Sequence, residues 1–86
     1  MTPAERIAII EERLRTTFSP SRLEIVDDSW RHKGHEGSRD GAGHYTVIIA
    51  TAHFANKSRI DAHREIYAVL DDLIPQEVHA LQIKIV

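Results

Sequence analysis

The sequence predicts an α+β fold in which two helices lie on one face of a three-stranded mixed sheet. Residues 2–18 and 58–73 have apolar side chains at helical spacing, and three shorter stretches are rich in β-branched residues. In chain order these stretches give helix, strand, strand, helix, strand. Placing both helices on the same face of the sheet buries both apolar sides at once. Nothing in the 86 residues indicates a repeat or a second domain, so we expect residues 1–86 to form one domain.

The first predicted helix begins at the N-terminus. Thr2, Pro3 and Glu5 have the order of an N-cap, a first helical residue and a capping-box acid. Four apolar residues follow at spacings of three and four: Ile7, Ile10, Leu14 and Phe18. Pro20 ends the helix, and we expect the element to be purely structural.

Two strands are predicted next, over residues 22–27 and 44–50. The second is the clearer one, because its apolar side chains at Tyr45, Val47 and Ile49 alternate with the intervening residues, as in a strand with one better-buried face. We expect the two strands to pair antiparallel. About sixteen residues connect them, where a hairpin uses about two to five, and the sequence places all four glycines in this connection: Gly34, Gly37, Gly41 and Gly43.

The second helix has the strongest pattern in the chain. Ser58 can cap its first turn, Asp61 supplies the acidic residue of a capping signature, and Pro75 stops the helix after Leu73. One half of the helix is apolar, with Ile60, Ile66, Tyr67, Val69, Leu70, Leu73 and Ile74. His63 falls near the middle of this apolar half, in the second turn. It is therefore either a core histidine or a histidine at the rim of the core.

The third strand is predicted over residues 78–85, where apolar and polar residues alternate imperfectly. A helix connects it to the second strand, so these two strands can pair parallel through a right-handed crossover. The sheet is then mixed.

Composition excludes several kinds of chemistry. The chain has no cysteine, which rules out disulfides and thiolate catalysis and means that a soft metal centre needs sulfur from a partner. A net charge of −2 with 28% charged residues does not favour nucleic acid, and no stretch is apolar enough to span a membrane. The N-terminus shows no targeting signal, so we expect a cytoplasmic protein. No phosphate-binding glycine motif or activated nucleophile is visible, so we expect neither an enzyme nor a small-molecule substrate.

Six histidines in so short a chain point towards metal chemistry. His32 and His35 lie in the glycine-rich connection, and His44 stands where the second strand begins. Neutral imidazole binds zinc, copper and iron, although solvated loop histidines are the simpler interpretation. If the loop and the beginning of the second helix share one end of the molecule, His35 or His44 can meet His63 across a small cleft. For the remaining two we expect a surface position for His53 and a structural role for His79.

Several of these residues together resemble the BolA-like proteins. The resemblance rests on Phe54, Lys57, His63, Arg64, Tyr67, Leu70 and the run Val78-His79-Ala80-Leu81, preceded by a His-Tyr-x-Val strand start and a loop with glycine and histidine. It extends over nearly the whole chain. It implies a single BolA-like domain with a helix-strand-strand-helix-strand fold similar to class II KH domains, in agreement with the predicted order.

The resemblance also implies a partner and a cofactor. BolA-like proteins pair with monothiol glutaredoxins, and a [2Fe-2S] cluster is held by the glutaredoxin cysteine, a glutathione thiol and imidazoles of the BolA-like partner. The histidine of the His-Arg pair matches His63 and a loop histidine matches His35, with His32 and His44 as competing candidates. Two positions depart from the family pattern, where Asn56 replaces a common glycine and Ala62 a common arginine.

Two other functions remain open from the sequence. Some family members act on transcription, which keeps a KH-like nucleic-acid-binding regulator, with DNA as partner, as the alternative. KH domains clamp the backbone with a GxxG loop between helices, whereas the only such run here, Gly34-His35-Glu36-Gly37, lies between strands. A histidine site that binds zinc or copper without a partner is the third hypothesis.

Overall fold

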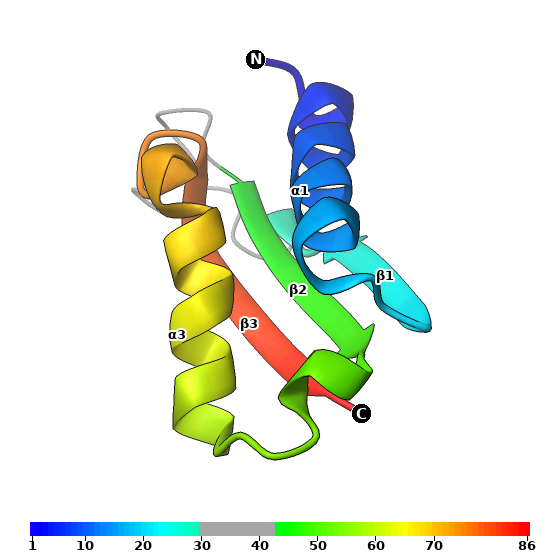
Figure 1. The fold of residues 1–86 in the computed structure, drawn as a ribbon. Coiled ribbons are helices and arrows are strands. Elements are labelled where there is room, and N and C mark those ends of the chain that lie inside the picture. The colour runs from blue at the N-terminus through cyan, green and yellow to red at the C-terminus, as the bar shows by residue number, and fades with distance from the viewer. Residues whose placement is uncertain (30–42) are drawn as a thin grey trace.

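The elements follow the predicted order in the computed structural model, which describes residues 1–29 and 43–86 (Figure 1). The helices and strands are α1 (Pro3–Phe18), β1 (Arg22–Asp27), β2 (Gly43–Ala50), α3 (Arg59–Val69) and β3 (Val78–Ile85). Two short 3-10 helices, η2 (Ala52–Phe54) and η3 (Asp71–Leu73), flank α3 in the chain. The predicted α+β fold is confirmed.

The sheet has the order β1-β2-β3 and is mixed, as predicted. β1 pairs antiparallel with β2, and β2 pairs parallel with β3, so that Tyr45 lies between Asp27 and Leu81. Both helices cover the same face of this sheet (Figure 1). β3 forms one edge of the described sheet, and there the Tyr67 hydroxyl of α3 donates a hydrogen bond of 2.9 Å to the Leu81 carbonyl.

Apolar side chains from both helices and from the sheet form one core between them. The residues with no exposed surface are Ile10, Leu14, Val47, Ile49, Ile66, Leu70 and Val78. Phe18 and Phe54 close the core near the end of α1, with ring centroids 5.0 Å apart. None of the described helices is long and apolar enough to cross a membrane.

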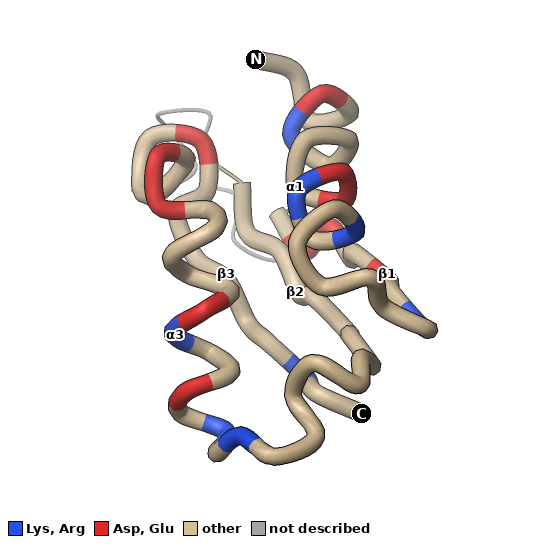
Figure 2. Tube along the Cα trace, viewed as in Figure 1, with Lys and Arg blue, Asp and Glu red and all other residues tan. Residues whose placement is uncertain are grey.

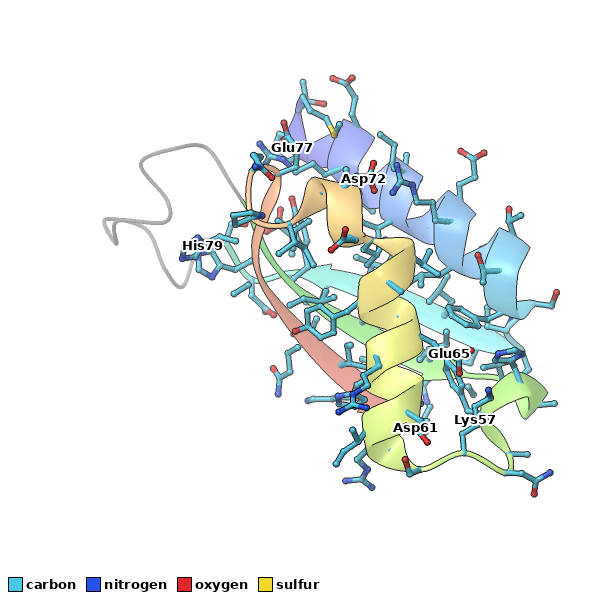
Figure 3. The ribbon with its side chains drawn as sticks, turned by 60° about the vertical axis from the view of Figure 1, so that its left-hand side comes forward. Lys57, Asp61, Glu65, Asp72, Glu77 and His79 are labelled. Carbon is cyan, nitrogen blue, oxygen red and sulfur yellow. The ribbon has the colours of Figure 1, made fainter. Side chains whose placement is uncertain are left out.

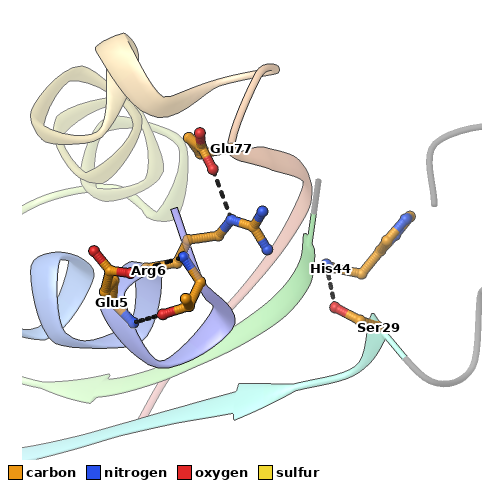
Figure 4. Close-up of polar contacts among 6 residues, drawn as sticks. Glu5, Arg6, Ser29, His44 and Glu77 are labelled. Atoms are coloured by element: carbon orange, nitrogen blue, oxygen red, sulfur yellow. Dashed lines mark hydrogen bonds and ion pairs between the residues drawn. The ribbon is translucent and has the colours of Figure 1, made fainter. Parts of the chain in front are cut away.

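The caps of both helices are the ones that the sequence predicts. Thr2 and Glu5 form a reciprocal capping box, with hydrogen bonds of 3.1 and 3.2 Å, and the Ser58 hydroxyl accepts from the Asp61 amide at 3.1 Å. The start of α1 is also tied to the approach to β3, because Arg6 donates a hydrogen bond of 2.8 Å to Glu77 (Figure 4). The sequence contains no local signal for this partly buried ion pair, because its two residues lie far apart in the chain.

One glycine of the predicted connection belongs to β2. The strand begins at Gly43, one residue before the predicted boundary, and the Gly43 amide donates to the Glu77 carbonyl at 3.0 Å. A Cβ atom at this position would collide with the Tyr45 ring, which lies against the same face of the strand. Glycine is therefore required by the close approach of an aromatic ring rather than by a loop.

The second helix is shorter than predicted and turned about its axis. Its α-helical part ends at Val69, and η3 continues to Leu73. The buried side is centred on Ala62 and Ile66. Ile60 and Tyr67, which the sequence places on the apolar half, are 66% and 41% exposed. The helix turns the small side chain of Ala62 towards the core, and part of its predicted apolar half therefore faces outward.

Candidate histidine site at the end of the sheet

β2 and β3 run parallel and begin at the same end of the sheet, and each brings a histidine there. Gly43 lies opposite Val78, whereas the next residue, His44, lies opposite Ala80. The pairing therefore passes over His79, as in a β-bulge. An extra residue of this kind redirects its side chain, and His79 projects beside His44 rather than taking part in regular alternation.

The two imidazole rings contact each other. Their centroids are 5.2 Å apart and their planes are tilted by 54°. His44 is buried, with 6% of its surface exposed, while His79 is exposed at the start of β3 (Figure 3). A partner protein can therefore reach the His79 ring directly, with His44 packed behind it.

The polypeptide around His44 is fixed by several hydrogen bonds. The His44 amide donates to the Ser29 hydroxyl at 3.0 Å (Figure 4), and the Asp28 amide donates to the His44 carbonyl at 2.7 Å. The Asp28 carboxylate in turn accepts from the Thr46 hydroxyl at 2.5 Å. These contacts hold the two strand ends that flank residues 30–42 in a defined geometry. The imidazole pair therefore stands on rigid elements.

His63 lies elsewhere, in a groove along α3. The groove has a volume of about 550 Å³ and is lined by one side of the helix, including Ile60 and Tyr67. His63 is half-buried, its Nε2 atom is buried, and no described residue gives that nitrogen a hydrogen bond. A metal could bind this nitrogen only if the side chain turned outward. Of the two sequence interpretations, the rim histidine fits this position better than the core histidine.

The described residues bring His44 next to His79 and not next to His63. α3 runs opposite to β3, and Tyr67 contacts Leu81, two residues after His79 (Figure 1). His63 stands four residues before Tyr67, which is about 6 Å further from the beginning of β3. In Figure 3, His79 lies at the start of β3, far from Asp61 at the beginning of α3, and Asp61 is two residues before His63 in the chain.

The remaining sequence candidates are the two loop histidines and His53. His32 and His35 lie outside the described residues, so a pairing of His35 with His63 stays a prediction. His53 occupies the predicted surface position. Its Nε2 atom lies 3.0 Å from Glu65, and hydrogen bonds from His53 and then Lys57 lower the pKa of that carboxyl group. This cluster packs on Phe18 and belongs to the support of α3 rather than to the histidine pair.

The arrangement offers imidazole ligands for an incomplete metal site. Neutral imidazole binds iron through one ring nitrogen, and an exposed histidine at a strand end can do so without unfolding its surroundings. Within residues 1–29 and 43–86, no three histidine or acidic side chains gather to hold an ion. From the sequence, a structural role is expected for His79. The signal that could have identified it as a candidate ligand is the Val78-His79-Ala80-Leu81 run, which is part of the family resemblance.

Comparison with known proteins agrees with the sequence resemblance. Residues 14–86 match the family described as BolA-like protein. The DNA-binding transcriptional regulator BolA of Escherichia coli is 39% identical over 72 residues, which cover 84% of this chain and 66% of that protein. The SufE-like protein 1 of Arabidopsis thaliana is 37% identical over 79 residues, which cover 86% of this chain and only 21% of that protein.

Solved structures agree in fold. The BolA domain of SufE1 from Arabidopsis thaliana superimposes with a TM-score of 0.81 at 34% identity, over 93% of this chain and 88% of that domain. The fold places the chain in a class of small α+β proteins in which two helices cover one face of a three-stranded mixed sheet. The chain belongs to the BolA-like protein family.

Proposed function

We propose that this chain is a BolA-like adaptor that pairs with a monothiol glutaredoxin and shares a [2Fe-2S] cluster with it, in iron-sulfur cluster trafficking or iron regulation. The proposal takes residues 1–86 as a single BolA-like domain. The observation that carries it is the exposed His79 ring packed on His44 at the end of the sheet. A cysteine-free chain supplies no thiolate, so the thiolate ligands of the cluster come from the glutaredoxin and from glutathione.

The ligands from this chain are one histidine of the folded strands or helix and one histidine near the loop. For the first, the sequence resemblance supplies His63, and the exposure of His79 makes it the rival that the geometry favours. For the second, His35 is the candidate and His44, which is packed behind His79, is the less favoured one. When bound, a cluster with imidazole in place of thiolate has a higher reduction potential and a ligand that protonation can displace.

The test is reconstitution with a monothiol glutaredoxin, glutathione, iron and sulfide, followed by visible absorption and circular dichroism. We expect His79→Ala and His35→Ala to change the visible spectrum and to weaken the heterodimer, because each removes a ligand. His63→Ala tests the rival candidate: an altered spectrum would assign this ligand to His63, and an unaltered one would leave it with His79. His53→Ala is the matched control, since it removes an exposed imidazole at the other end of the sheet.

Identical spectra and identical complex formation for all histidine variants would remove the cluster from the function of this chain. A change with His63→Ala alone would return the ligand assignment to the helix. Binding of zinc or copper by the isolated chain, abolished by the same variants, would favour a metal site that needs no partner.

DNA binding is the second candidate, because the Escherichia coli relative carries the name of a DNA-binding transcriptional regulator. Lys57 and Arg59 lie together at the beginning of α3, where Figure 2 shows basic residues. Fluorescence anisotropy with duplex DNA at two salt concentrations tests this function. Salt-dependent binding that is weakened by Lys57→Ala and Arg59→Ala would support the DNA-binding function. Binding with the same affinity in wild type and both variants would not support it.

A further inference from the structure

β1 is an edge strand, and no strand within residues 1–29 and 43–86 pairs with its outer side. The Asp28 amide donates to the His44 carbonyl at 2.7 Å, and these two residues lie opposite each other when the register of β1 and β2 is continued by one pair. Backbone direction alternates along a strand, so the even-numbered residues of β1 turn their amides and carbonyls towards β2. The backbone groups of Leu23, Ile25 and Asp27 therefore point outward from the sheet.

The apolar core reaches this edge and is only partly covered there. Leu23 and Ile25 lie on the face of the sheet that the helices cover, and both are half-buried against the core. Ile7 of α1 is half-buried as well, on the side of the helix away from Arg13, which contacts α3. Figure 1 shows α1 lying over β1 and β2. One more strand beside β1 would lie under this side of α1 and cover the exposed parts of these side chains.

The other face of β1 carries charges that compensate each other. Arg22 and Glu24 form an ion pair of 2.5 Å within the strand, and Val26 is 42% exposed beside them. A charged side chain on a neighbouring strand would meet no uncompensated charge here. Uncharged β-branched side chains fit this face best, because they pack well between strands.

A second copy of this chain is a poor occupant of the edge. Two β1 strands about a twofold axis pair antiparallel, with outward-facing residues opposite each other. With the axis at Glu24, the two Glu24 carboxylates face each other, and like charges at opposite positions destabilise a strand pair. With the axis at Ile25, Asp27 faces Leu23 on the apolar side. An axis nearer either end leaves half of β1 without a strand opposite it, because β1 spans only Arg22–Asp27.

We propose that the outer edge of β1 binds an extended segment of another protein. The segment adds to the three-stranded sheet antiparallel to β1, the slightly more stable direction of pairing. Its side chains are apolar at every second position, next to Leu23, Ile25 and Ile7, and uncharged at the positions between. Backbone hydrogen bonds give the affinity, and the apolar positions give the selectivity. β1 and β3 are opposite edges of the sheet, so the proposal is independent of a cluster bound at His79.

The probe is a soluble peptide of alternating valine and threonine with lysines at both ends. It is added to the isotope-labelled full chain without iron or glutaredoxin, and NMR spectra report the amides. A single short strand buries less than a standard interface, so we expect a dissociation constant between about 10 µM and 1 mM. At saturation, hydrogen exchange at the amides of Leu23, Ile25 and Asp27 should slow at least about tenfold. Unchanged amide signals of β1 at about 2 mM peptide overturn the proposal.

Two methylated peptides separate backbone pairing from general apolar contact. In an antiparallel pair, the valines that face α1 also turn their amides towards β1, whereas the threonine amides point away from it. N-methylation of the valines should therefore weaken binding at least about tenfold, and N-methylation of the threonines should leave the dissociation constant within about threefold. Equal binding of the two methylated peptides overturns the proposal, because pairing along one edge requires them to differ.

A variant of the chain tests the same edge from the other side. Ile25→Pro removes an outward amide and obstructs an incoming strand, yet it leaves the hydrogen bonds between β1 and β2 in place. It should weaken binding of the unmodified peptide at least about tenfold. Val26→Thr, on the other face of the same strand, is the control and should change the affinity less than about threefold. Circular dichroism checks the fold of both variants. Equal affinity of folded Ile25→Pro and wild type contradicts the proposal, and the methylated peptides decide if this variant does not fold.

Discussion

Arg6 and Glu77 show how one ion pair joins two distant parts of the chain. The Arg6 side chain is 9% exposed and its Nε atom lies 2.8 Å from the Glu77 carboxylate. Burial lowers the pKa of the Arg6 guanidinium, but Glu77 and the nearby Tyr45 hydroxyl raise it by more, so the net pKa is raised. Arg6 therefore keeps its charge inside the fold, and the stability of the fold depends on the Glu77 carboxylate that compensates this charge.

Glu77→Ala should lower the free energy of unfolding by about 2 kcal/mol, because it leaves the buried Arg6 charge without a carboxylate. Glu77 is itself 29% exposed, so water can compensate part of the loss. Urea denaturation of wild type and variant measures the difference. The double variant Arg6→Met/Glu77→Ala should lose less than Glu77→Ala alone, since it removes the uncompensated charge. If both variants lost the same free energy of unfolding, the uncompensated Arg6 charge would not be the cause of the loss.

At the scale of the elements, α1 and the end of α3 are linked by Arg13. Its guanidinium forms an ion pair with Asp72 through both nitrogens and also donates to the Val69 carbonyl at 3.2 Å. The hydrogen bond from Arg13 lowers the pKa of the Asp72 carboxyl group. The link therefore exists where Asp72 is ionised and disappears where it is protonated.

Asp72→Asn should be less stable than wild type at pH 7, and the difference should vanish in acid. A carboxyl group whose pKa is lowered by folding stabilises the fold above its unfolded pKa of about 4, and this contribution is lost as the pH falls through the lower folded value. Urea denaturation of dilute protein at pH 7 and at pH 2 measures the difference. Asp71→Asn, at the neighbouring exposed carboxylate, is the control and should show no such dependence.

Sequence reasoning succeeded for elements and failed for orientation. The caps at Thr2 and Ser58 and the order of the strands are local signals, and they are confirmed. The side of α3 that faces the sheet is not local, because apolar periodicity does not tell that Ala62 packs inward while Ile60 faces outward. The ring contact of His44 and His79 depends on strand pairing and on a bulge, which a single sequence does not encode in its spacing.

At the scale of the whole molecule, β2 holds the fold together. It is the central strand, pairs on both sides, and contributes Val47 and Ile49 to the core without exposed surface. β1 is an edge strand whose side chains alternate between exposed and half-buried. The core residues of β2 become exposed to solvent only when the helices separate from the sheet. β1 can detach from the sheet edge with a smaller loss of contacts.

Amide hydrogen exchange should therefore be slowest in β2. We expect the hydrogen-bonded amides of residues 45–49 to exchange only through global unfolding, with a protection free energy equal to the free energy of unfolding from urea denaturation. Amides of residues 23–26 should exchange faster through partial opening. The reverse order, with β1 the more protected strand, would contradict the assignment of β2 as the last element to open.

The hydrogen bond from the Tyr67 hydroxyl to the Leu81 carbonyl has a consequence for aggregation. β3 is an edge of the described sheet, and unpaired edges are templates on which a foreign segment can add in cross-β growth. Because Tyr67 already occupies one backbone acceptor of this edge, an incoming strand must first displace the phenol before it can align with Leu81. An aromatic side chain from the covering helix thus guards the chain against amyloid-like templating.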